Sequence, residues 1–200
     1  MANKIRVAIL ISGRGSNMKA LIDACKEPDF PAEICLVISN KANAEGLIYA
    51  KENQIPTKII ESKNFSKDEN GRMEFDKLVF QEIVNHKIDL VCLAGFMRIL
   101  SKWFVENLTN KIINIHPSLL PSFKGANAVL DALKAGVKIT GCTTHFVTEK
   151  MDDGPIIMQS AIEIDVDDNL ESLAKKILVQ EHKIYPQTLR LISKKILNSL

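Results

Sequence analysis

The sequence lacks a hydrophobic run that could cross a membrane, and it lacks a secretion signal. No apolar stretch approaches the roughly 20 residues that a membrane-spanning helix requires. Residues 1–6 do not show the charged, apolar and small-residue order of a signal peptide, and the apolar run 7–11 is too short to supply one. We therefore expect a cytoplasmic protein with no membrane partner.

The sequence also lacks a charge excess and any close pair of cysteines. It contains 26 Lys and Arg against 24 Asp and Glu, a formal net charge of +2, which argues against a dedicated nucleic-acid-binding protein. The four cysteines, at positions 25, 35, 92 and 142, are too widely spaced for a zinc knuckle or a redox CxxC motif. We expect reduced thiols that serve mainly as small buried side chains.

Metal-binding patterns are absent as well. There is no HExxH motif and no cluster of His and Cys, which argues against a catalytic zinc. Asp165, Asp167 and Asn169 resemble the start of an EF-hand loop, but Leu170 and Lys176 stand where that loop needs Gly and Glu. We predict no metal site, and we expect these acidic residues to cap the last helix.

The alternation of apolar runs and helical patterns indicates an α/β fold. The chain has 200 residues, 46% hydrophobic and 25% charged, without repeats or linkers, so we expect one domain over 1–200. The pattern predicts a Rossmann-like open twisted sheet, mostly parallel, with antiparallel C-terminal strands and helices on both faces. Predicted strands are 5–11, 34–38, 57–60, 88–94, 111–115, 139–148 and 156–164. Predicted helices are 16–26, 42–53, 73–85, 126–135 and 168–195, the last bent at Pro186, and 62–72 is predicted as a surface connection.

Three unusual segments follow predicted strands directly. They are 12–17 after the first strand, 95–98 after the fourth and 114–121 after the fifth. Ligands of open α/β sheets bind outside the carboxyl ends of the strands. The three segments therefore predict one site at that edge.

The first of these segments, Ser-Gly-Arg-Gly-Ser-Asn at 12–17, is a glycine-rich loop that leads into a helix. Free N–H groups at a helix start suit an anion, although a plain turn with Ser16 or Asn17 as the N-cap is an equal alternative. No Lys-Ser or Lys-Thr follows, as a P-loop requires, and Met18 replaces the third glycine of a dinucleotide fingerprint. The loop favours a phosphomonoester over a nucleotide triphosphate or NAD.

The third segment carries Asn114 and His116, which strand alternation places on one face. An amide donor and an imidazole that face one point can stabilise a developing oxyanion and move protons. Asp152, in the segment 151–155, would stabilise the imidazolium if it lay beside His116, although its spacing alone favours a simple hairpin turn. His145 alternates with Thr143 and is a candidate for the same face.

Six motifs then resemble the family of folate-dependent glycinamide ribonucleotide formyltransferases over essentially the whole chain. They are ISGRGSN at 11–17, SNKANAEGL at 39–47, LAGFMRIL at 93–100, NIHPSLLP at 114–121, HFVTEKMDDGPII at 145–157 and QEHKIYP at 180–186. The resemblance implies formyl transfer from 10-formyltetrahydrofolate to the primary amine of glycinamide ribonucleotide, in purine (IMP) biosynthesis. It implies small-molecule substrates, no metal and no nucleic acid, and it leaves open a monomer or a homodimer.

The resemblance also implies roles for individual residues. The catalytic positions would be Asn114, His116 and Asp152. The substrate phosphate would be held by Gly15, Ser16 and Asn17, and the ribose by Glu181. The folate pocket would be formed by Met97, Arg98, Ile99 and Leu100. Arg98 would pair with the carboxylate of the folate tail. The alternatives are core packing for Met97 and Ile99 and a solvated surface charge for Arg98.

Two positions depart from the family pattern. Asp153 stands where several members have Gly, which would change the backbone freedom of the catalytic turn. Leu178 stands where some members have a Gln near the phosphate, which would weaken that end of the site.

Several other functions are considered. A 10-formyltetrahydrofolate hydrolase of the family carries an additional N-terminal domain, for which the strand at Ile5 leaves no room, and the tRNA-specific formyltransferases carry an additional C-terminal one, whereas this chain stops at Leu200. A non-catalytic phosphosugar-binding module would need the glycine loop but not the catalytic residues. A nicotinamide oxidoreductase is disfavoured by Met18 and by Ser39-Asn40, where an acid is expected.

Overall fold

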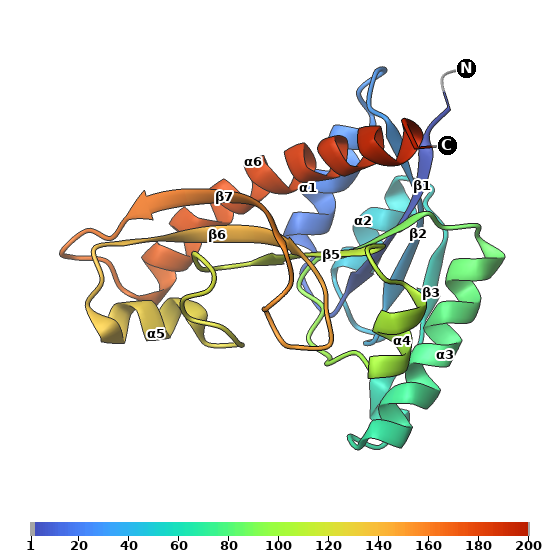
Figure 1. Cartoon of the computed structure of the whole chain (residues 1–200), viewed down its shortest axis with the longest axis horizontal. Helices are drawn as coiled ribbons and strands as arrows, with labels where there is room; N and C mark the ends of the chain where they lie inside the picture. Colours follow the sequence, from blue (N-terminus) through green and yellow to red (C-terminus); the bar gives the residue numbers. More distant parts are fainter. Residues whose placement is uncertain (1–2, 200) are drawn as a thin grey trace.

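A seven-stranded mixed sheet in the order β3-β2-β1-β4-β5-β6-β7 forms the centre of the protein (Figure 1). The structure is a computed structural model that describes residues 3–199. Five strands run parallel, and the last two are antiparallel to their neighbours. The strands are β1 (Ile5–Ile11), β2 (Ala32–Ser39), β3 (Thr57–Ile59), β4 (Leu90–Leu93), β5 (Ile112–His116), β6 (Ile139–Phe146) and β7 (Ile156–Glu163). The predicted fold class is confirmed.

Helices cover both faces of the sheet, and each face has its own apolar core. The helices are α1 (Ser16–Cys25), α2 (Gly46–Glu52), α3 (Glu69–Asn85), α4 (Lys102–Asn107), α5 (Ala128–Ala135) and α6 (Leu170–Leu197). The first core joins α1, α2 and α6 to one face, and the second joins α3 and α4 to the other. Strands buried on both faces by helices are nearly continuous apolar runs, which is why β1 and β4 could be predicted from sequence.

The structure corrects three local predictions. Helix α4 was not predicted, because its six residues are fewer than two turns and show no helical period. Helix α2 begins at Gly46 rather than 42. Helix α3 begins at Glu69 rather than 73, because the side chain of Asp68 caps it by accepting from the N–H of Gly71. The predicted connection 62–72 therefore contains a 3-10 turn (Ser62–Asn64) and the start of α3.

The last helix, α6, continues through Pro186, and Asn169 and Ser172 form a capping box at its start. Lys176 pairs with both Asp165 and Asp168, so an ammonium group occupies the place where an EF-hand would hold calcium. Within residues 3–199 no three His, Cys, Asp or Glu side chains gather as a metal site would require. In the same described range, no helix combines the length and the apolar character that membrane crossing demands.

Candidate active site

Three chain segments meet at the carboxyl ends of the parallel strands. Strand pairing places Leu10 of β1 next to Leu93 of β4, and Leu93 next to Asn114 of β5. Beyond the strands, the backbone N–H of Met97 donates to Ser12 Oγ at 2.7 Å, which ties the segment after β4 to the glycine loop. The convergence expected from sequence is therefore present.

Gly15 sets the shape of the glycine loop. It is the N-cap of α1 in the left-handed conformation, with φ of 74°. A Cβ at this position would lie 2.9 Å from the Cα of Gly46, so another residue would be both strained and crowded. No side chain caps α1, so the alternative of a helix N-capped by Ser16 or Asn17 is wrong.

Asn17 instead reaches across to the last helix. Its Nδ2 donates to Glu181 Oε2 at 2.7 Å, and both side chains are buried. Burial raises the pKa of Glu181, and the Asn17 hydrogen bond acts in the opposite direction. Asn17 Oδ1 is buried and has no hydrogen-bond partner among residues 3–199. Two residues that the resemblance assigned to one substrate therefore lie in contact.

His116 is buried at the end of β5 and is held on both sides of its ring. Its Nε2–H donates to the carbonyl oxygen of Phe123 at 2.8 Å, and its Nδ1 lies 3.4 Å from Asp152 Oδ2. Both ring nitrogens can donate only when the imidazole is protonated. The His116 ring is therefore held between a backbone carbonyl on one side and the Asp152 carboxylate on the other.

Asp152 lies on the connection between β6 and β7, which folds back over β5. Its φ is 50°, and its Oδ2 accepts from the N–H of Gly125 at 2.8 Å. Two residues later, a Cβ on Gly154 would collide with the carbonyl oxygen of Phe146, so the connection packs closely against the end of β6. The segment is a turn, as its composition indicates, and its backbone also directs the carboxylate at His116.

His145 completes the cluster, although the sequence made it no more than a candidate. It is 2% exposed, and Asn114 is its partner across β5 and β6. Its Nδ1–H donates to Phe146 O at 2.9 Å, which leaves Nε2 as an acceptor 3.3 Å from Asn114 Nδ2 and 3.7 Å from Asp152 Oδ1. Burial lowers the pKa of His145. The alternation with Thr143 predicted the face of the strand on which His145 lies. Its contact with Asn114 follows only from the register of β6 against β5.

The segment 97–100 alternates between solvent and the second core. Met97 and Ile99 are 73% and 54% exposed, so core packing is the wrong interpretation for both. Leu100 packs against the second core. The guanidinium of Arg98 lies 4.5 Å from the centre of the Phe75 ring and donates to the carbonyl oxygen of Gly71 at 3.1 Å. Arg98 is therefore not a solvated surface charge.

The two departures from the family pattern have different surroundings. Asp153 pairs with Lys124 in an exposed ion pair, which joins the turn that carries Asp152 to the loop after β5. Exposed pairs of this kind contribute about 0–1 kcal/mol. Leu178 is half-buried on α6, three residues before Glu181.

A half-buried amide, a buried imidazole and a half-buried carboxylate at the strand ends of such a sheet can stabilise an oxyanion and move protons, which is the chemistry of an acyl-group transfer enzyme. The sequence model of the formyl transferase family matches residues 5–189, and the chain belongs to that family.

Named relatives narrow the assignment within the family. Phosphoribosylglycinamide formyltransferase of Haemophilus influenzae is 42% identical over 92% of this chain and 85% of its own length. The crystal structure of glycinamide ribonucleotide transformylase 1 from Symbiobacterium toebii superposes with a TM-score of 0.92 at 40% identity, over 98% of this chain and 90% of that one. The family recognised from the six motifs is confirmed.

A third relative is much longer than this chain. The trifunctional purine biosynthetic protein adenosine-3 of Gallus gallus is 49% identical over 96% of this chain, which spans only 19% of the length of that protein. The similarity to this relative therefore concerns one portion of a larger protein.

Proposed function

We propose that this chain transfers the formyl group of 10-formyltetrahydrofolate to the amino group of glycinamide ribonucleotide in purine biosynthesis, as one formyltransferase domain. The observation that carries the proposal is the set of Asn114, His116 and Asp152, in which a buried imidazole lies between a carboxylate and a backbone carbonyl. The family membership supports the same reaction.

In this reaction the amine attacks the formyl carbon, and negative charge develops on the formyl oxygen. The amide of Asn114 would donate to that oxygen, and the positive charge of the His116 imidazolium would stabilise the negative charge that develops there, which lowers the energy of the transition state. Asp152 would polarise His116 and help move the proton from the amine to the departing folate nitrogen. His145, neutral and bound to Asn114, would hold the amide in place.

The glycine loop would bind the substrate phosphate. Gly15, Ser16 and Asn17 stand at the start of α1, where N–H groups point toward an anion. Glu181 would accept from the ribose hydroxyls while it accepts from Asn17.

The segment after β4 fits an apolar ring system with polar edges. Met97 and Ile99 expose large apolar side chains, which would flank the pterin, while backbone groups read its edge. Leu100 would support this surface from the core, and Arg98 would meet a carboxylate of the folate tail. We further propose a cytoplasmic enzyme that is a monomer or a homodimer, which light scattering after gel filtration would measure.

The experiment is a spectrophotometric assay of 10-formyl folate consumption without added metal, run with and without glycinamide ribonucleotide. We expect deformylation only when the amine substrate is present. Deformylation without the amine would identify a hydrolase instead. A non-catalytic binding module would show no reaction in either case. It would also still bind a phosphosugar after replacement of Asn114, His116 and Asp152.

A further inference from the structure

A carboxylate outside the described site is fully buried, and only one of its two oxygens accepts a hydrogen bond. Asp76 on α3 is 0% exposed and lies between Phe75 and Val79, in register with the second core. Its Oδ2 accepts from the backbone N–H of Ser101 at 2.6 Å, and its Oδ1 has no hydrogen-bond partner in the described part of the chain. Burial of a carboxylate is costly, so a residue of this kind calls for a compensating interaction.

Arg98 supplies the opposite charge. Its Nε is also buried without a partner, while its guanidinium stacks on Phe75 and donates to Gly71 O. Burial raises the pKa of Asp76, whereas the Ser101 hydrogen bond and the Arg98 charge lower it. Burial lowers the pKa of Arg98, and Asp76 counteracts that shift. The opposite charges of Asp76 and Arg98 thus partly offset the cost of removing each from solvent.

One short segment contains Arg98 and ends next to Ser101, the residue that donates to Asp76. Arg98 lies inside the segment 97–100, and Ser101 follows it as the N-cap of α4, with its Oγ accepting from Phe104 N–H at 3.3 Å. At the other end, Met97 is fixed by Ser12. With both ends fixed and Arg98 drawn inward, Met97 and Ile99 must face outward.

We infer that Asp76 is a positioning residue for folate binding: it holds the segment 97–100 from behind, so that its outward apolar side chains form the folate-binding surface. The inference rests on the proposed function, because it takes folate as the ligand of that segment. Asp76 itself touches neither substrate nor the reacting atoms. Its contribution is expected in the binding of the formyl donor and not in the chemical step.

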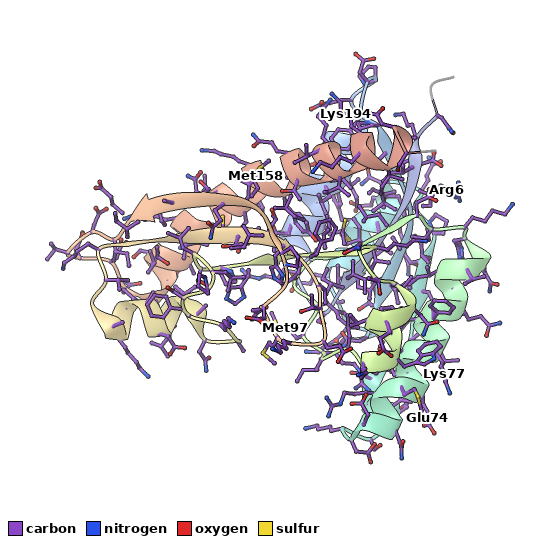
Figure 2. All side chains as sticks on the ribbon, in the orientation of Figure 1. Arg6, Glu74, Lys77, Met97, Met158 and Lys194 are labelled. Carbon is purple, nitrogen blue, oxygen red and sulfur yellow. The ribbon has the colours of Figure 1, made fainter. Side chains whose placement is uncertain are left out.

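The test compares two variants of Asp76 with two controls. Asp76→Ala removes the acceptor and the charge, whereas Asp76→Asn keeps an acceptor for Ser101 and loses only the charge. Glu74→Gln removes an exposed carboxylate from the same helix, where Figure 2 shows Glu74 pointing away from the body of the protein. Ile5→Ala destabilises the opposite end of β1, in the first core, without contact with this segment.

The first readout is steady-state kinetics with the 10-formyl folate varied. We expect KM for the folate to rise about thirtyfold in Asp76→Ala and about fivefold in Asp76→Asn, with kcat and KM for glycinamide ribonucleotide within about twofold of the original enzyme. Both controls should keep the KM for folate. If Ile5→Ala raised the KM for folate as much as Asp76→Ala does, the effect would reflect general destabilisation and the inference would be overturned.

The second readout needs no activity. Trp103 is the only tryptophan in the chain, and it packs edge-on against Phe80 of α3 at 5.3 Å, one turn after Asp76. We expect its emission to shift in Asp76→Ala, less in Asp76→Asn, and in neither control. Unchanged emission in Asp76→Ala would overturn the positioning role. Shifted emission with an unchanged KM would overturn its link to folate. An original enzyme without turnover would contradict the proposed function, and Trp103 would still test the positioning.

Discussion

Replacement of Asp152 by Asn tests the electrostatic core of the proposed mechanism. The side chains of His116 and Asp152 are only 6% and 11% exposed, and their facing atoms are 3.4 Å apart. At an effective dielectric constant of about 20, two unit charges at this separation attract by about 5 kcal/mol. An amide dipole would keep part of this attraction, so we expect a loss of about 3 kcal/mol, or about a hundredfold in kcat.

The same substitution should leave the fold intact. Asn adopts the left-handed conformation at φ of 50° as readily as Asp, and its oxygen can still accept from Gly125 N–H. The assay is kcat for formyl transfer, with thermal unfolding as the check on folding. Asp153→Asn is the matched control, since it removes a neighbouring carboxylate that pairs with Lys124 in solvent. Near-normal kcat in Asp152→Asn, or an equal loss in Asp153→Asn, would refute the reasoning.

Three further outcomes follow from the described contacts. Gly15→Ala should lower the free energy of unfolding by about 2 kcal/mol in urea titrations, and Gly13→Ala, with open space at its Cβ, by less than about 1 kcal/mol; equal losses would contradict the strain at Gly15. The pKa of His145, measured by NMR, should lie below the ordinary histidine value of about 6.5, because burial disfavours its charged form. As the pH falls below about 6.5 the unfolded state binds the proton more readily than the folded state, so the contribution of His145 to stability should be lost. A measured pKa at or above about 6.5 would contradict a buried neutral imidazole. Glu181→Gln should raise KM for glycinamide ribonucleotide about tenfold with kcat retained, and an unchanged KM would remove Glu181 from substrate binding.

The sequence predicted those features that depend on local patterns. Buried strands such as β1 appear as unbroken aliphatic runs, and the strand-end rule placed Asn114 near the glycine loop. Helix α4 could not be predicted in this way, since it is short and is fixed by contacts of Ser101 with α3. Ser101 caps α4 locally, whereas the carboxylate of Asp76 that holds Ser101 comes from a distant part of the chain.

Within the site, residue types were easier to predict than their contacts. The direction of the Asp152 side chain depends on one positive φ, which no spacing rule reveals. The contact of Asn114 with His145 depends on the register of β6 against β5. The role of Asp76 was not visible at all, because a lone acidic residue in an amphipathic helix is usually solvated.

The hydrogen bond from Asn17 to Glu181 joins residues 164 positions apart, between helices α1 and α6. During synthesis on the ribosome, the glycine loop emerges early, yet its partner is made only after all seven strands. A nascent chain therefore cannot form this hydrogen bond until its last helix has docked against the first. If the pair binds the substrate as proposed, ligand binding would be coupled to the integrity of the whole domain, and bound substrate would protect the protein against unfolding.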